Sequence, residues 1–134
     1  MKRRAIPKTK VIPVTKLKKR LWQLCREIIF TRHGNDCYSC GAKGLFGSNR
    51  QCGHFLPSSI CSAAMRYDLD NLRPQCMVCN VHRSGNWPAY EAHLVRDGID
   101  PNELKRRNQQ TIGKQYDRLF YQNKIAEYEG LLSD

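Results

Sequence analysis

Two pairs of cysteines constrain this chain of 134 residues more than any other feature. Cys37 and Cys40 form the first pair, Cys76 and Cys79 form the second, and two residues separate the thiols in each. Paired thiolates at this spacing, repeated a few tens of residues apart, are typical of a four-thiolate zinc site. Such a site is structural, because no position on the ion is left for water or substrate. The alternative, four ordinary buried thiols, leaves the doubled spacing unexplained.

The other cysteines bear on the compartment. Seven is an odd number, no secretory signal precedes the first pair, and Cys25, Cys52 and Cys61 remain outside it. These features favour a reducing cytoplasm over a disulfide framework. With 40% hydrophobic residues the chain can bury one modest core, which a metal ion would help to stabilise. No apolar run approaches the ~18 residues that a membrane helix needs, so no membrane partner is expected.

Positive charge is concentrated at the start of the chain. The net charge is +11, from 23 Lys and Arg against 12 Asp and Glu, and the first twenty residues contain no acid. Clustered cations indicate a polyanionic partner such as DNA, although a solubilising surface is the alternative. Residues 1–14 are interrupted by Pro7 and Pro13, so we expect a flexible arm that contacts phosphates. The cations expected to contact nucleic acid here are Lys2, Arg3, Arg4, Lys18, Lys19 and Arg20.

Apolar spacing and turn residues predict an α+β fold after the arm. Residues 15–134 are expected to form one domain, with a zinc-stapled core over 36–98 and a helical part over 99–134. The expected elements are a helix over residues 15–33, strands over 51–56 and 65–72, a short helix from Asn80 to about Gly85, a helix over 88–96, another that opens at Asp100, and a long helix over 112–132. The apolar stripe of the last helix is interpreted as core; a homodimer across it is the alternative.

His54 is the candidate general base. It lies between the two cysteine pairs, and a neutral imidazole near pH 7 can take a proton from water. Asn71 follows in the same segment, and its carboxamide could fix the imidazole in one tautomer. The alternatives are a structural histidine, a zinc site that includes Cys52 and His54, and an asparagine that only makes a turn.

Asn80 and His82 are the candidate ligands of a second, catalytic ion. Asn80 directly follows the last thiol, and its amide oxygen suits a hard cation such as Mg²⁺. His82 is the competing ligand and suits softer ions, but residues two apart on a regular helix do not face one point. Arg73 and Arg83 are expected to clamp phosphate, with plain surface arginines as the alternative.

These motifs resemble the HNH, or ββα-metal, nucleases, and more specifically the lambdoid phage NinG (Rap) recombination endonuclease family. The resemblance covers about residues 36–98. It rests on the stretches 37–41, 53–55, 65–67, 71–72 and 75–86, together with Tyr90.

The resemblance implies a phage endonuclease, in the cytoplasm of a bacterial host, that cuts branched DNA such as Holliday junctions and D-loops. It implies a small zinc-stapled core with two short antiparallel strands and flanking helices. His54 would be the base, Asn71 its partner and Asn80 a ligand of Mg²⁺ or Mn²⁺, with 5′-phosphate and 3′-hydroxyl products. Gly53 stands where many HNH enzymes have a metal ligand, so coordination is expected to rely on water, phosphate and a neighbour such as His82 or Asp36. The alternative function is a non-catalytic zinc-stabilised module that binds DNA or RNA.

Overall fold

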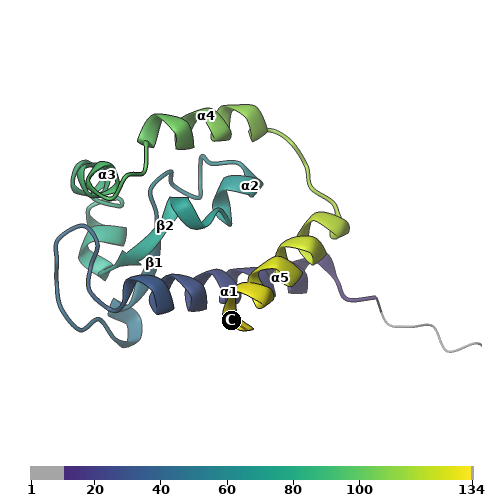
Figure 1. Ribbon diagram of the computed structural model, residues 1–134, viewed down its shortest axis with the longest axis horizontal. Coiled ribbons are helices and arrows are strands. Elements are labelled where there is room, and N and C mark those ends of the chain that lie inside the picture. Colours follow the sequence, from purple (N-terminus) through teal and green to yellow (C-terminus); the bar gives the residue numbers. More distant parts are fainter. Residues whose placement is uncertain (1–10, 134) are drawn as a thin grey trace, which may run out of the picture.

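The computed structural model describes residues 11–133, in which a two-stranded sheet lies among five helices (Figure 1). The elements are α1 (Val14–His33), β1 (Gln51–His54), α2 (Ala63–Arg66), β2 (Leu72–Gln75), α3 (Trp87–Arg96), α4 (Pro101–Thr111) and α5 (Arg118–Ser133). Short 3₁₀ turns cover Gly47–Asn49 and Leu69–Asn71, and a π-helical turn covers Val78–His82. The mixed α+β architecture predicted from the sequence is confirmed. Most of the predicted arm lies outside the described residues.

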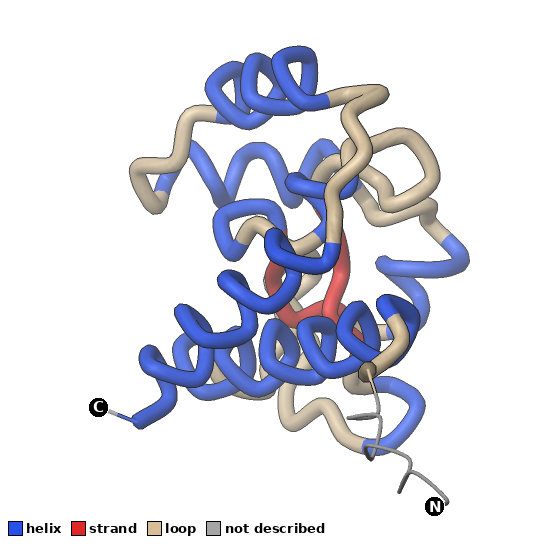
Figure 2. The backbone as a smooth tube through the Cα atoms, turned by 90° about the vertical axis from the view of Figure 1, so that its right-hand side faces the viewer, coloured by secondary structure: helices blue, strands red, loops and turns tan. Residues whose placement is uncertain are grey.

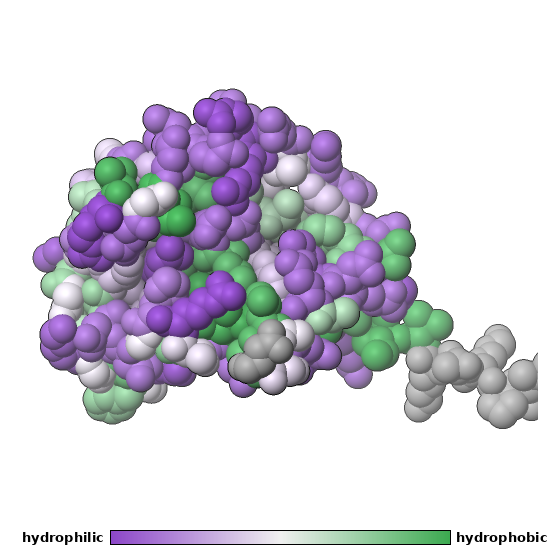
Figure 3. Space-filling view, viewed as in Figure 1, coloured by the Kyte–Doolittle hydropathy of each residue, from purple (hydrophilic) through white to green (hydrophobic). Residues whose placement is uncertain are grey.

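The first core lies between α1, α5 and β2. The predicted apolar stripe of α1 is buried, with Leu21 and Ile29 at 0% exposure, and Gly34 ends the helix at φ 77°. Tyr128 of α5 is also buried, and its hydroxyl donates a hydrogen bond of 2.6 Å to the carbonyl of Tyr67. The last helix therefore packs part of its stripe, from Tyr121 to Tyr128, into the core of the same chain, whereas Leu119 and Leu131 of the predicted stripe are exposed. Figure 3 shows hydrophobic side chains in a hollow above α1, surrounded by hydrophilic residues.

The sheet is antiparallel and occupies the centre of the molecule (Figure 2). Gln51 pairs with Gln75 and His54 pairs with Leu72, so each strand contributes four residues. Tyr90 of α3 is fully buried, and its hydroxyl donates a hydrogen bond of 2.9 Å to the carbonyl of Gly53. This bond attaches α3 to the strand that carries the candidate base.

The second core lies between α3, α4 and the segment that connects the strands. Its buried side chains are Phe55, Leu56, Cys61, Met65, Tyr90, Leu94 and Leu104. As predicted, α4 begins at Asp100, whose side chain accepts a hydrogen bond of 2.9 Å from the backbone N–H of Asn102. These contacts hold the inter-strand connection against the two helices, on the side of the sheet away from α5 (Figure 1).

The strand predicted over 65–72 is wrong in position. Residues Ala63–Arg66 are helical, and β2 begins only at Leu72. Local capping explains the difference: the Ser62 hydroxyl accepts from the N–H of Met65 at 3.1 Å, and the Asp68 carboxylate accepts from the N–H of Asp70 at 2.9 Å. Both side chains stabilise tight turns at the expense of extended backbone.

Three other boundaries differ from the sequence prediction. β1 ends at His54 rather than at residue 56, and the turn after the second cysteine pair begins at Val78 rather than at Asn80. The last helix begins at Arg118 rather than at residue 112, because Gly113 has a left-handed backbone conformation, at φ 79°, that a helix cannot include. The Asp117 carboxylate then accepts a hydrogen bond of 3.2 Å from the N–H of Phe120 at the start of α5. Among residues 11–133 there is no helix with the length and apolar character needed to cross a bilayer.

Candidate functional site

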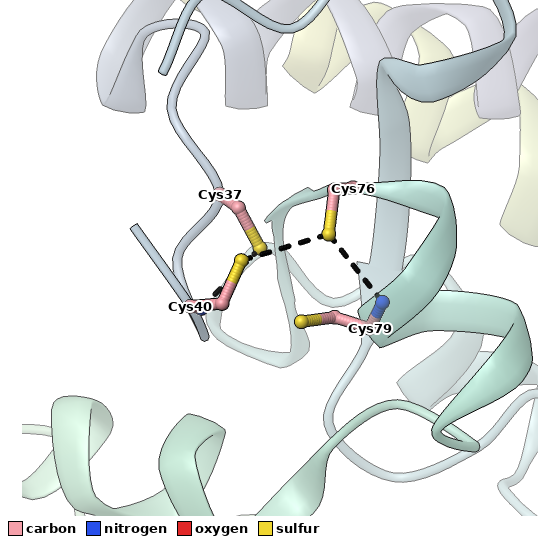
Figure 4. A group of neighbouring side chains, drawn as sticks. All are labelled: Cys37, Cys40, Cys76 and Cys79. Carbon is pink, nitrogen blue, oxygen red and sulfur yellow. Dashed lines mark hydrogen bonds between the residues drawn. The ribbon is translucent and has the colours of Figure 1, made fainter. Parts of the chain in front are cut away.

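The four cysteines of the two pairs converge on one point (Figure 4). The sulfur atoms of Cys37, Cys40, Cys76 and Cys79 all lie within 4.8 Å of one another. The Sγ atoms of Cys40 and Cys76 are 3.7 Å apart, close to the ~3.8 Å edge of a tetrahedron with metal–sulfur bonds of about 2.3 Å. The donor set and its spacing therefore fit a metal ion such as zinc.

Backbone N–H groups point at these sulfurs. Cys40 N–H donates to Cys37 Sγ at 3.5 Å, and Cys79 N–H donates to Cys76 Sγ at 3.4 Å. Burial acts to raise the pKa of the Cys37 thiol, but N–H groups of Cys40, Cys76 and Ser39 outweigh it and lower that pKa to about 7. Burial raises the pKa of the Cys40 and Cys79 thiols, so Cys37 gives up its proton more readily than these two, as a metal ligand must.

Gln75 joins the cysteine cluster to the rest of the site. Its side chain is fully buried, and its Nε2 donates to Ser39 Oγ at 2.8 Å and to the carbonyl of Gly85 at 2.7 Å. One residue thus connects the loop of the first pair, the segment after the second pair and β2. The positions of these segments are coupled to the metal centre through this carboxamide.

A cleft of about 580 Å³ lies between β1 and the segment that follows the second cysteine pair. Side chains from α1, β1, the segment after β1 and the segment after the second pair line it: Trp22, Cys52, His54, Pro57, Ser58, Ser59, Asn80, Ser84 and Gly85. His54 and Asn80, both predicted site residues, are brought together here. His82 is exposed and is not among the lining residues, because it follows Asn80 by only two positions.

The His54 ring is half-buried and held on two sides. Its Nε2 lies 2.9 Å from the carbonyl oxygen of Arg66, and the ring stacks on Trp22 with centroids 5.2 Å apart and an interplanar angle of 8°. Burial lowers the pKa of His54 below its ordinary value of 6.5; the positive charge of Arg66 adds to this, and the hydrogen bond to the Arg66 carbonyl opposes it. The imidazole is therefore neutral at pH 7.

Asn71 does not bind the imidazole, and the predicted contact between them is wrong. The Asn71 carboxamide is fully buried; its Oδ1 accepts from Leu56 N–H at 2.7 Å, and its Nδ2 donates to the Met65 carbonyl at 3.0 Å. It therefore connects the end of β1 to α2, whose Arg66 carbonyl orients His54. The Asn71 side chain therefore supports the backbone that orients the ring and does not contact the ring itself.

Asn80 is positioned by β1. Its Nδ2 donates to Gln51 Oε1 at 2.7 Å, which fixes its Oδ1 as the free oxygen of the carboxamide. Ser84 follows four residues later and also lines the cleft. Sequence reasoning missed Ser84, which lies beyond the π-helical turn at φ 49°, where helical spacing does not apply. It also missed the stacking of Trp22 on the His54 ring.

Gly53 is required by its surroundings. A Cβ built on Gly53 would lie 1.7 Å from Gln75 Oε1 and 3.0 Å from Asn80 Oδ1. Gln75 Oε1 is buried next to Gly53 and has no hydrogen-bond partner among the described residues. The space that a side chain at position 53 would need is occupied by the Gln75 carboxamide.

The predicted cationic residues have different locations. Arg73 is 5% exposed, and its Nη1 donates to the carbonyls of Leu69 and Leu72 at 3.1 and 2.7 Å, so the prediction that it clamps phosphate is wrong. Arg83 is exposed. Lys18, Lys19 and Arg20 are exposed on α1, where Arg20 pairs with Glu129 at 3.4 Å. Lys2, Arg3 and Arg4 lie outside the described residues.

Comparisons with known proteins agree on one family. A sequence model described as "NinG: Bacteriophage Lambda NinG protein" matches residues 2–133. Proteins named NinG from Escherichia phage 933W and Escherichia phage lambda are 32% and 34% identical over 78 residues, 53% of this chain and 37% of theirs. The protein of that name from Salmonella phage P22 is 38% identical over 64 residues, 47% of this chain and 30% of its own. The matched segments thus span 30–37% of the length of these relatives. No solved structure matches.

Adding a methyl group at Gly53 is expected to destabilise the fold. In Gly53→Ala the new Cβ collides with the buried Gln75 carboxamide, and overpacking of this kind costs about 1–3 kcal/mol. Chemical denaturation measures the loss. Gly130→Ala is the matched control, because Gly130 lies within α5 with no neighbouring atom within 4 Å of its Cβ position. Equal stability of the two variants would contradict the described packing.

Removing metal is expected to unfold the segment between the cysteine pairs. The purified chain should contain about one zinc ion, and a strong chelator or Cys76→Ser should lower the melting temperature, because metal-binding free energy is folding free energy in such sites. Elemental analysis and thermal melting followed by circular dichroism measure both quantities. Cys61→Ser, at a buried thiol outside the cluster, is the control for metal content.

Proposed function

Because the chain belongs to the bacteriophage NinG family, we propose that it is a metal-dependent DNA endonuclease that hydrolyses phosphodiesters in branched recombination intermediates such as Holliday junctions and D-loops. The HNH-like motifs support the hydrolytic reaction, and the net charge of +11 supports a nucleic-acid substrate. In this proposal the four cysteines hold a structural zinc ion. The preference for branched DNA rests on the family resemblance.

The observation that carries the proposal is the fixed imidazole at the cleft. A carbonyl oxygen can only accept, so the 2.9 Å contact with the Arg66 carbonyl requires a proton on His54 Nε2. The neutral ring then has its lone pair on Nδ1. The low pKa keeps this nitrogen unprotonated at pH 7. A fixed, neutral imidazole in a cleft has the properties of a general base.

In the proposed mechanism, His54 removes a proton from water as its oxygen forms a bond to phosphorus. The bond from phosphorus to the 3′ oxygen breaks, and the products are a 5′-phosphate and a 3′-hydroxyl that takes its proton from solvent. Asn80 Oδ1 would be a ligand of a Mg²⁺ or Mn²⁺ ion, and the Ser84 hydroxyl is a second oxygen in the same cleft. Such an ion, when bound, stabilises negative charge on the phosphate oxygens.

One observation favours the alternative, a non-catalytic zinc-stabilised module that binds DNA or RNA. No side chain can extend from position 53, because Gln75 occupies that space, and His82 lies off the cleft. In the part of the chain that the structure describes, the cleft therefore has few protein oxygens for an ion and no carboxylate among its lining residues. A binder of this kind needs only the cations and the metal-stabilised fold.

His54→Ala is expected to abolish cleavage. The purified protein should nick a synthetic four-way junction in the presence of Mn²⁺, and loss of the general base should reduce the rate by about 10²- to 10⁴-fold. His82→Ala is the matched control, since this exposed histidine does not line the cleft. Junction binding without cleavage by the wild type would favour the non-catalytic module, and equal cleavage by His54→Ala would remove His54 from the mechanism.

The pH dependence of cleavage should reflect the buried ring. Because burial lowers the pKa of His54, the unprotonated base persists into acid, and the rate should fall only below pH 6.5. Trp22→Ala uncovers one face of the ring, so the midpoint of the acid limb should move up toward 6.5, whereas Trp22→Phe should keep it low. Single-turnover rates between about pH 4.5 and about pH 8, a range that brackets the ordinary histidine pKa of 6.5, measure the midpoints. An unchanged midpoint in Trp22→Ala would show that stacking does not set the pKa.

A further inference from the structure

A second cavity, of about 360 Å³, lies on α1 beside the start of β1. Its lining residues are Gln23, Arg26, Glu27, Phe30, Thr31 and Arg50. Neither of its two arginines is among the cations predicted from the sequence, since they stand apart from the basic N-terminal run. The cavity does not share a lining residue with the cleft that contains His54.

The two guanidinium groups are held in place. Arg50 stacks on the Phe30 ring, 3.7 Å from the centroid, and its Nε donates to Asn35 Oδ1 at 2.8 Å. Arg26 lies over the same ring at 5.4 Å, and its Nη2 donates to the carbonyl of Arg50 at 3.4 Å. No described residue accepts a hydrogen bond from the terminal nitrogens of Arg50, which therefore remain free for a ligand.

A stacked guanidinium with free terminal nitrogens is suited to an oxyanion. Its two parallel N–H groups match two oxygens of a phosphate, and little side-chain entropy is lost on binding because the group is already fixed. Glu27 opposes this preference, since its exposed carboxylate lines the same cavity. Two fixed cations against one carboxylate leave an excess of positive charge in the cavity.

The cavity and the cleft lie along the same two elements. On α1, Trp22 stacks on His54 and Arg26, one turn later, binds the backbone of Arg50. On β1, His54 is four residues after Arg50. One helical turn spans ~6 Å and four strand residues span ~13 Å, which corresponds to about two to four nucleotides of one DNA strand. A strand that passes His54 can therefore reach the arginines.

We propose that Arg26 and Arg50 form a phosphate-binding site for the DNA strand that flanks the cleaved bond. This inference rests on the proposed function for its substrate, and it names the contact that holds the strand in register with His54. Arg50 makes the main contact. Arg26 positions it through the Arg50 backbone and adds charge. Glu27 limits the affinity, so that the strand can leave after cleavage.

The test is equilibrium binding of a fluorescent four-way junction with no added divalent ion, at several salt concentrations. Arg50→Gln should weaken binding about tenfold and reduce the slope of log affinity against log salt by about 1. The affinity of Arg50→Lys should lie between those of the wild type and Arg50→Gln, because lysine keeps the charge but lacks the planar guanidinium. Glu27→Gln should strengthen binding, and this opposite sign cannot arise from a damaged fold.

Arg106→Gln is the matched control. It removes the same charge from an exposed arginine of α4, which lies across the molecule from α1 (Figure 1). The site is further defined by junctions with a single methylphosphonate at each of the phosphates near the nick. The affinity of the wild type for the junction should fall when the modified phosphate lies about two to four nucleotides from the bond placed at His54. The affinity of Arg50→Gln should not fall further with that modification.

Equal affinity and salt slope for Arg50→Gln and Arg106→Gln would overturn the inference, as would methylphosphonate losses that the variant does not erase. These measurements need no cleavage. Wild-type protein that shows the phosphate contact but never nicks DNA would refute the enzyme and leave this site standing. Cleavage of the junction by wild-type protein that lacks this phosphate contact would support the enzyme and refute the phosphate site.

Discussion

The convergence of four sulfur atoms is the constraint on which the rest of the structure depends. Cys40 and Cys76 are 36 residues apart in the chain, yet their sulfurs lie 3.7 Å from each other. The segment between them contains β1, the one-turn helix α2, β2 and short 3₁₀ turns, so it has little regular structure of its own. A metal ion bound by these four sulfurs would remove the conformational freedom of a long loop, and would thereby fix β1 and the turn that carries Asn80.

The polar interior around this centre forms one connected arrangement. Gln75 binds both cysteine-bearing segments, Tyr90 binds the Gly53 carbonyl, and Asn71 binds Leu56 and Met65. Each of these buried groups uses its hydrogen bonds to hold other segments of the chain in place. The imidazole at the cleft is oriented by a carbonyl and a stacked indole that this arrangement brings together.

The amount that could be predicted from sequence depended on the range of the interaction. The cysteine quartet follows from spacing alone, and the α1 stripe follows from its period, so both were found. The second strand was displaced because Ser62 and Asp68 cap turns through side-chain bonds that periodicity does not detect. Asn71 was assigned to His54 because both are polar and lie in one segment, whereas the partner of His54 is a main-chain oxygen that no residue type reveals. Arg73 shows the same limit, since an arginine that binds carbonyls in a core has no signature in the sequence.

The Gln75 carboxamide that fills the space over Gly53 makes positions 53 and 75 a linked pair. A carboxylate introduced at 53 by a single substitution meets an obstacle, and a smaller residue introduced at 75 by itself leaves Ser39 and Gly85 without their common donor. A lineage that gains or loses a charged side chain at position 53 must therefore change positions 53 and 75 together, or pass through a poorly folded intermediate. Among relatives, the two positions should consequently covary as a unit, with glycine accompanying glutamine.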